Sequence, residues 1–266
     1  MKQGMPKPRG FHWMLYGPPG VGKTTVISQM PKPTAILDTD GGAGWLYHNL
    51  DNVSVFQLVE DEDPAKAVED FLKAGALGKG PAADFASVAV DTLSALRGAH
   101  LSHLAGGGLF YEIGDYGTAT NWLRRVLLLT QYSPQVICWT THVSEEQDGP
   151  RLVYRPSGLS DTGRELIAQK LDAIVFMGRS SGGKGGESKR FLTTQEIDPV
   201  NGRAAVLAKD RTGLLPDVMD FPGLDDDGNP PDMFGPFFGD VMKQLNIGTE
   251  PAKSPAKSKA KPAVKK

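Results

Sequence analysis

A glycine-rich segment that follows a short apolar run constrains the fold of this chain more than any other feature. Residues 17–24 read Gly-Pro-Pro-Gly-Val-Gly-Lys-Thr and fit the pattern G-x-x-x-x-G-K-[ST]. The apolar residues 11–16 predict a buried strand before the segment, and residues 24–30 predict a helix after it. Backbone N–H groups of the turn and the positive end of the helix dipole then converge on one point. The sequence therefore predicts a phosphate-binding loop that binds a nucleoside triphosphate.

The residues of this loop have distinct expected roles. Lys23 would neutralise the β- and γ-phosphates, and Thr24 would hold the Mg²⁺ ion that bridges them, so ATP and Mg²⁺ are the expected cofactors. Thr25 would continue the helix. The residues expected to bind the nucleotide are Gly17, Pro18, Pro19, Gly20, Val21, Gly22, Lys23, Thr24 and Thr25.

Length and charge predict one domain and a tail. For 266 residues we expect one α/β domain over residues 1–246 and a disordered basic tail over residues 247–266. The tail places six lysines among Ala, Pro and Ser, a composition that cannot bury enough apolar surface to become ordered. The rest of the chain carries more acidic than basic residues. Contact with nucleic acid would therefore need a local basic patch or the tail.

The sequence also indicates where the protein works. Cys138 is the single cysteine and lies in an apolar run, so no disulfide forms within the chain and a reducing compartment is expected. No run approaches the ~20 apolar residues of a membrane span, and residues 1–9 lack the apolar centre of a secretory signal. We therefore expect a soluble, cytoplasmic protein that does not contact a membrane.

Short apolar runs alternate with helical patterns along the chain. Strands are expected at residues 34–37, 53–58, 85–90, 135–139, 173–177, 189–194 and 204–207, and helices at 64–74, 118–130 and 164–170. This alternation predicts an α/β fold with a largely parallel central sheet flanked by helices and antiparallel strands at one end. Glycine-rich or polar residues predict loops at 98–117, 143–160 and 180–188. Phe234, Phe237 and Phe238 are expected to pin the C-terminal segment to the domain.

Two acidic residues follow predicted strands. Asp91 ends the run 85–91, where it can hold Mg²⁺ opposite Thr24 from a strand adjacent to the phosphate loop. The next residue is Thr92 and not a glutamate, so the base that activates water must come from elsewhere. Asp40 is the best candidate, delivered by a strand beside that of the loop. The alternative is that Asp38 and Asp40 only start a turn before Gly41.

A histidine and two cations complete the candidate site. His142 ends the fourth predicted strand, where it can sense the γ-phosphate, or simply cap the strand through a hydrogen bond. Lys209 and Arg211 lie one residue apart, so in an extended strand their side chains point the same way. They could reach the γ-phosphate of a neighbouring subunit, or they could be a solvated surface pair.

Taken in order, these residues resemble the RecA family, and more closely the phage-type RecA-like ATPases of single-strand annealing. Beside the phosphate loop, Asp38-Thr-Asp40 resembles the family's Asp-x-Glu with its catalytic acid, and the run from Asp91 to Leu96 resembles its magnesium strand. Ile113-Gly-Asp-Tyr-Gly117 is similar to its first DNA-binding loop. Thr141-His142 stands where the family has its Asn-Gln sensor, and Lys209-Asp-Arg211 where it has trans-acting cations. The resemblance spans roughly residues 10–215.

The resemblance implies a RecA-like P-loop ATPase that binds single-stranded DNA and promotes annealing or strand exchange in phage recombination or replication. It further implies a homo-oligomer in which Lys209 and Arg211 act in trans, a single-strand-binding protein as a partner, and the host cytoplasm as location. A second DNA loop would lie within residues 143–160, although a β-hairpin with exposed Arg151 and Arg155 fits that segment equally well. The alternative functions are a nucleotide-gated switch or assembly ATPase that acts on a protein without DNA, and a small-molecule kinase.

Overall fold

The strand that precedes the phosphate loop lies in the middle of the sheet. The computed structural model describes residues 10–44, 50–58, 63–77, 82–108, 110–131, 133–180, 189–196, 204–223, 225 and 229–247. Within them, β1 (His12–Gly17) pairs in parallel with β5 (Val136–Asp148) on one side and β7 (Ala173–Ser180) on the other. All six residues of β1 are buried. The phosphate loop therefore emerges from the best-supported strand of the sheet.

The other strands extend the sheet on both sides. The strand order is β11-β8-β7-β1-β5-β4-β2-β3, with β2 (Thr34–Asp38), β3 (Val53–Gln57), β4 (Ser87–Asp91), β8 (Lys189–Thr193) and β11 (Val218–Phe221). The six strands from β7 to β3 run parallel, and β8 pairs antiparallel with β7 on one side and with β11 on the other. Three further strands pair with these: β6 (Arg151–Pro156) pairs with β5, β9 (Ala205–Val206) pairs with β6, and β10 (Lys209–Asp210) pairs with β7. The predicted fold class, a mostly parallel sheet with an antiparallel end, is confirmed.

Strand order corrects one detail of the sequence-based expectation. The strand of Asp91 was expected next to the phosphate-loop strand, and so was the strand before Asp40. In the structure β5 lies between β1 and β4, and β2 lies beyond β4. The order of elements along a chain does not fix the order of parallel strands in space, because a crossover can insert a later strand between earlier ones.

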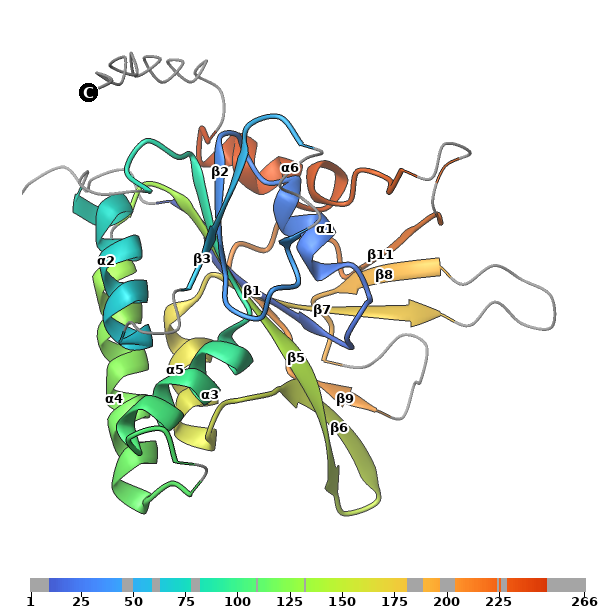
Figure 1. The fold of residues 1–266 in the computed structure, drawn as a ribbon. Coiled ribbons are helices and arrows are strands. Elements are labelled where there is room, and N and C mark those ends of the chain that lie inside the picture. Colours follow the sequence, from blue (N-terminus) through green and yellow to red (C-terminus); the bar gives the residue numbers. More distant parts are fainter. Residues whose placement is uncertain are drawn as a thin grey trace, which may run out of the picture.

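Helices cover both faces of the sheet (Figure 1). One face carries α2 (Pro64–Leu77), α3 (Leu93–Leu104), α4 (Ile113–Thr130) and α5 (Asp161–Lys170), and the other carries α1 (Lys23–Ser28) and α6 (Phe234–Gln244). Alternate residues of β1 serve the two cores: Met14 and Tyr16 pack toward α2–α5, and Trp13 and Leu15 pack toward α1 and α6. A strand buried on both faces reads as a continuous apolar run, as this one does.

The C-terminal phenylalanines hold α6 against the sheet, as expected. Phe238 is fully buried, and its ring lies 4.4 Å from that of Trp13 on β1 and 4.7 Å from that of Phe234. Gln29 adds a polar link, because its side chain donates to Pro231 O and accepts from the backbone N–H of Met233. Apart from Ile247, the predicted basic tail lies outside the described residues.

Two of the three predicted loops contain regular structure. Residues 98–117 include the end of α3 and the first turn of α4, so the loop prediction was wrong for those helical parts; residues 105–108 and 110–112 between the helices are in neither helix nor strand, as predicted. Gly98 lies within α3, which ends at Leu104 and is followed by Gly106 and Gly107, both at positive φ. α4 begins at Ile113, where Glu112 and Asp115 form a capping box. The third predicted loop, residues 180–188, lies outside the described residues except for Ser180.

Residues 143–160 form the hairpin that was the open alternative to a loop. β5 runs on without a break past His142 to Asp148, turns at Gly149, and pairs with β6 in the register Val143↔Pro156 to Asp148↔Arg151. Half of β5 is thus a buried sheet strand and half a projecting hairpin arm (Figure 1).

Candidate nucleotide site

The phosphate loop curls around the end of the Lys23 side chain. Lys23 is 6% exposed, and its Nζ donates to Gly17 O at 3.0 Å and to Pro18 O at 3.1 Å. Burial lowers the pKa of Lys23, and the nearby carboxylates of Asp91 and Asp40 partly offset that shift. Gly20 and Gly22 have φ of +68° and +113°, values that L side chains rarely adopt. The loop therefore has the conformation and the cation expected of a phosphate cradle.

Thr24 and Asp91 meet as the magnesium expectation requires. Thr24 Oγ1 donates to Asp91 Oδ2 at 2.7 Å, and Thr140 Oγ1 on β5 donates to Asp91 Oδ1. Burial raises the pKa of Asp91, while the two threonine hydrogen bonds oppose the rise. Within the described ranges, no group of three His, Cys, Asp or Glu could hold a metal alone. Mg²⁺ would therefore need phosphate oxygens and water beside these two side chains, which suits an ion that keeps several waters.

Asp38 and Asp40 turn out to do different things. Asp38 is buried, and its carboxylate accepts from the backbone N–H groups of Asp40, Gly41 and Ala43, which makes it the organiser of a turn. Asp40 is exposed and lines the same pocket as the phosphate loop, with Oδ2 at 3.4 Å from Thr92 Oγ1. The turn interpretation thus holds for Asp38, whereas Asp40 lines the pocket beside the phosphate loop.

His142 lies beside the phosphate loop because β5 pairs with β1 in the register Gly17↔His142. Its Nδ1 is 3.4 Å from Lys23 Nζ. Burial lowers the pKa of His142, and Lys23 lowers it further. Ser157 N donates to His142 O, and Thr141 Oγ1 donates to Ser157 O, so this strand end is tied to the segment that follows β6. His142 therefore contacts the phosphate loop region through its side chain and the segment after the hairpin through its backbone.

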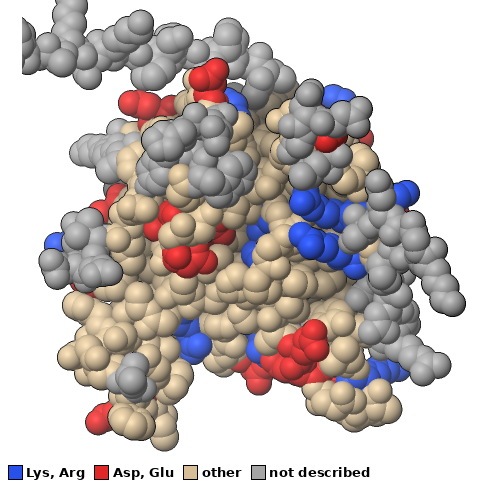
Figure 2. All heavy atoms as spheres, turned by 45° about the vertical axis from the view of Figure 1, so that its right-hand side comes forward, with Lys and Arg blue, Asp and Glu red and all other residues tan. Residues whose placement is uncertain are grey.

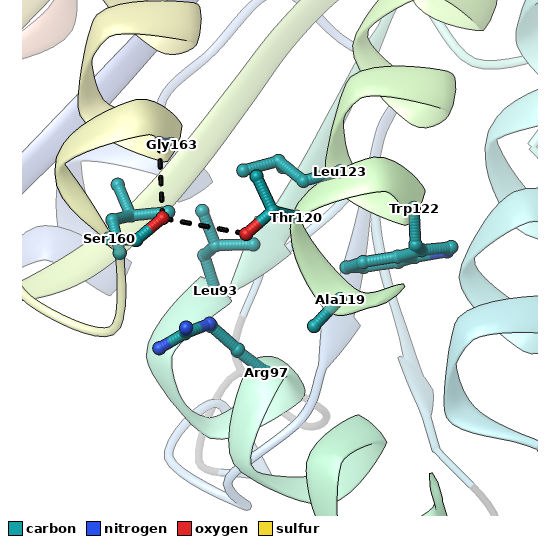
Figure 3. Close-up of a pocket in the computed structure, with 9 residues that line it drawn as sticks. Leu93, Arg97, Ala119, Thr120, Trp122, Leu123, Ser160 and Gly163 are labelled. Atoms are coloured by element: carbon teal, nitrogen blue, oxygen red, sulfur yellow. Dashed lines mark hydrogen bonds between the residues drawn. The ribbon is translucent and has the colours of Figure 1, made fainter. Parts of the chain in front are cut away.

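One pocket of about 340 Å³ collects these groups. It is lined by Pro19, Gly20, Gly22, Lys23, Thr24, Thr25, Asp40, Gly42, Asp91, Thr92, His142 and Arg190. The size and the polar lining fit the phosphates of a nucleotide, and Nη1 of Arg190 is a buried donor without a partner among the described residues. By contrast, the cavity between α3, α4 and α5 has only about 10 Å³, room for one water at most, where Thr120 and Ser160 face each other (Figure 3).

The sequence analysis missed two arginines at this pocket. Arg190 on β8 lines it, and Arg179 on β7 donates from Nη2 to Gly20 O of the phosphate loop at 2.5 Å. On the face drawn in Figure 2, Lys and Arg side chains gather in one group at the right, with acidic side chains to their left. The sequence holds only a weak signal for the pair, since Arg179 follows one predicted strand and Arg190 lies in the next.

Lys209 and Arg211 lie away from the phosphate loop of their own chain. Lys209 pairs with Ile174 near the start of β7, whereas Gly17 lies against Met177 further along that strand. Their side chains point the same way, as expected, and both donate to the last carbonyls of α5: Lys209 Nζ to Ala168 O and Leu171 O, and Arg211 Nη2 to Gln169 O. Cations there satisfy unpaired carbonyls and complement the helix dipole. Burial, followed by Arg211, lowers the pKa of Lys209 to about 8.

The two segments expected to bind DNA have contrasting surroundings. In the hairpin, Arg155 pairs with Glu146 at 3.1 Å, and the ring of Tyr154 stacks on Phe176 at 5.6 Å, so both are engaged within the chain. Residues 113–117 are the first turn of α4 and not a loop. Yet Phe110 and Ile113 there are 94% and 92% exposed, which is unusual for large apolar side chains.

The chain is similar in sequence to one protein family and in fold to two archaeal proteins of known structure. The AAA domain family matches the chain over residues 9–212. No protein of curated function matches it. A KaiC-like protein from the archaeon Pyrococcus horikoshii OT3 is 15% identical, with 70% of this chain and 79% of that chain covered and a TM-score of 0.41. The flagellar accessory protein FlaH from Methanocaldococcus jannaschii is 12% identical, with 70% and 78% covered and a TM-score of 0.39.

One further property concerns membranes. Across the part of the chain that the structure describes, no helix is both long and apolar enough to span a bilayer.

Proposed function

The chain belongs to the AAA domain family, and from that membership together with the pocket we propose that it binds ATP with Mg²⁺ and hydrolyses it. The observation that carries the proposal is that one pocket brings together side chains from α1, β4, β5 and the turn after β2, namely Lys23, Thr24, Asp91, His142 and Asp40. Lys23 and the backbone of the loop would neutralise and position the phosphates, and Thr24 and Asp91 would hold Mg²⁺, which would polarise the phosphates. Asp40 would accept the proton of the attacking water, and His142 would sense the γ-phosphate.

Two substitutions test binding and hydrolysis separately. Lys23→Ala should weaken ATP binding strongly and abolish phosphate release, because the phosphate charge loses its buried partner. Asp40→Asn should leave the Kd for ATP within a few-fold and slow kcat by about 10²–10⁴, since only the proton transfer is lost. Calorimetric titration and phosphate release give the two quantities. Lys66→Ala, an exposed cation on α2, is the control. Wild-type rates for Asp40→Asn would place the base elsewhere, and wild-type behaviour of Lys23→Ala would reject the site.

Binding of single-stranded DNA is a second proposed function, and the exposed residues at the start of α4 favour it. Phe110, Ile113 and Tyr116 are 94%, 92% and 43% exposed, and the guanidinium of Arg97 lies 5.6 Å from the Tyr116 ring. Apolar and aromatic side chains of this kind provide platforms on which unpaired bases stack, and a nearby arginine suits the phosphates. The resemblance to phage-type annealing ATPases supports the same assignment.

A DNA-binding experiment tests this second function. Phe110→Ser and Ile113→Ser should each weaken the binding of fluorescent oligo-dT, measured with ATP and Mg²⁺, by about 5- to 100-fold, because stacking contributes about 1–3 kcal/mol per base. Leu128→Ser, which removes another exposed side chain from α4, should bind as the wild type does. If the wild-type protein binds no DNA at low salt, the alternative applies, in which hydrolysis times the interaction with a protein partner.

We also propose that the active form is a homo-oligomer. Lys209 and Arg211 are held at the end of α5, away from the phosphate loop of their own chain, so any contact with a γ-phosphate would be made across an interface. In that arrangement each site takes its phosphate loop from one subunit and its cations from the next. A single-strand-binding protein as a further partner rests on the resemblance alone.

A further inference from the structure

Two arginines face each other across the β7–β8 pair. Arg179 and Arg190 are direct partners in the antiparallel register, where Cβ atoms lie about 4.5–5.5 Å apart. Like charges in this position destabilise a sheet unless an anion lies between or beside them. Among the described residues, neither arginine has an ion pair. Burial lowers the pKa of Arg190, and the charge of Arg179 lowers it further. Within the described part of the chain, two positive charges therefore lie side by side and neither is paired with a carboxylate.

The two guanidinium groups have different surroundings. Arg179 donates to Gly20 O, so it holds the outer side of the phosphate loop. Arg190 lies over the loop: its Nε is 3.6 Å from the position that a Cβ on Gly22 would occupy, and its Nη1 is buried without a hydrogen-bond partner in the described structure. A buried donor without a partner costs free energy that a bound anion would recover. Arg190 is thus a cation at the nucleotide pocket with a hydrogen-bond donor, Nη1, that no described residue satisfies.

The strand order indicates which part of a nucleotide Arg190 would meet. His142 and Asp91 reach the pocket from β5 and β4, on one side of β1, and Arg190 reaches it from β8, on the other side. The first side holds the groups expected for Mg²⁺ and the γ-phosphate. Arg190 lies instead over Gly22, whose loop cradles the α- and β-phosphates in sites of this pattern.

From this geometry we propose that Arg190 binds the α- and β-phosphates of nucleoside di- and triphosphates within its own chain, with Arg179 positioning the phosphate loop. The assignment rests on the proposed nucleotide site and extends it to a strand outside the phosphate-loop pattern. A planar guanidinium with several fixed donors suits bidentate contact with phosphate better than an ammonium group does. Because the contact does not involve the γ-phosphate, ATP and ADP depend on it equally.

The test measures Kd for Mg·ATP and Mg·ADP by calorimetric titration on the full chain. Arg190→Ala should weaken the binding of both nucleotides by a similar factor of about 10–100, the loss expected for charged hydrogen bonds. Arg190→Lys should recover only part of the affinity. Lys189→Ala is the matched control, because the neighbouring residue of a strand points to the opposite face, and it should bind as the wild type does.

Thermal melting separates this role from a structural one. Without nucleotide, Arg190→Ala should melt at or above the wild-type temperature, since it removes an unpartnered cation, and its stabilisation by ADP should shrink. A lower melting temperature with an unchanged ADP effect would overturn the proposal, as would unchanged affinity for both nucleotides. A loss confined to ATP would overturn the α,β-phosphate assignment. If the wild-type protein binds neither nucleotide, the proposed nucleotide site is wrong. If the wild type binds nucleotides and Lys23→Ala abolishes binding while Arg190→Ala does not weaken it, only the proposed role of Arg190 is wrong.

Discussion

Lys23 and His142 are neighbouring bases whose protonation states depend on each other. With Nζ 3.4 Å from Nδ1, the ammonium group can donate to His142 only when that nitrogen carries no proton. Burial and the charge of Lys23 keep the pKa of His142 below its ordinary value of 6.5, so the ring is neutral at pH 7. The Lys23–His142 contact therefore carries one positive charge and not two.

This contact predicts a pH-dependent stability. Since the folded pKa of His142 is lowered, the unfolded chain takes up the proton first; the stabilisation is complete above pH 6.5 and is lost as the pH falls through the folded pKa. Between pH 7.5 and pH 5, the free energy of unfolding should fall more steeply for the wild type than for His142→Asn, as urea denaturation can measure. His103→Asn, an exposed control, should follow the wild type. Parallel curves for wild type and His142→Asn would contradict the expectation.

At the scale of single residues, sequence reasoning works where spacing alone fixes geometry. The spacing within the phosphate loop placed Lys23 and Thr24, and an apolar run that ends in a carboxylate placed Asp91 opposite Thr24. Arg190 was missed because its position depends on a cross-strand register with Arg179 that is not readable from one sequence. The difference between Asp38 and Asp40 likewise depends on which of them points into the turn.

At the scale of elements, continuous apolar runs located the strands well, and glycine misled. Strands buried on both faces have a clear signal, and those around β1 lie where expected. Glycine counted as a loop signal in residues 98–117, but Gly98 is helical because α3 buries one side of itself, with Leu93, Leu96, His100 and Leu101. The second half of β5 stayed open between a loop and a hairpin, because its exposed arm is polar and lacks that apolar signal.

α6 provides an element-scale prediction. Phe238→Ala should lower the free energy of unfolding by about 3–5 kcal/mol, because a fully buried ring that packs on Trp13 leaves a cavity. Chemical denaturation measures the loss. Phe110→Ala, which removes the same side chain from a 94% exposed position, should change stability by no more than about 0.5 kcal/mol. Equal effects at the two positions would mean that α6 does not contribute to the core as the packing indicates.

At the scale of the whole molecule, the separation of Lys209 and Arg211 from their own phosphate loop leads to a mixing experiment. If the pair acts across an interface, Arg211→Ala and Lys23→Ala should each lack ATPase activity. A mixture of the two should recover part of it, because mixed interfaces pair an intact loop with intact cations. Activity should also rise more steeply than protein concentration in the dilute range, where assembly limits the number of complete sites.

The controls for mixing follow from the structure. Since Arg211 also bonds to α5, the melting temperature of Arg211→Ala must stay near that of the wild type for the loss of activity to count. Asp210→Asn is not a suitable control, because the Asp210 carboxylate accepts from Thr212 and Leu215. A lack of rescue, with rates proportional to concentration, would refute the shared site and leave a monomeric ATPase.

Because β5 is continuous, a movement of this strand beside the phosphate loop also moves the arm of the hairpin. From His142 to Asp148 the arm spans six residues, roughly 20 Å at about 3.3 Å per residue. For an arm of this length that moves as one body, a tilt of about 5° at the buried end moves the hairpin tip by about 2 Å. A movement of the buried end of β5 that is too small to change the packing of the core would thus become a larger movement of the hairpin tip. The tip lies at the molecular surface, where another molecule could contact it.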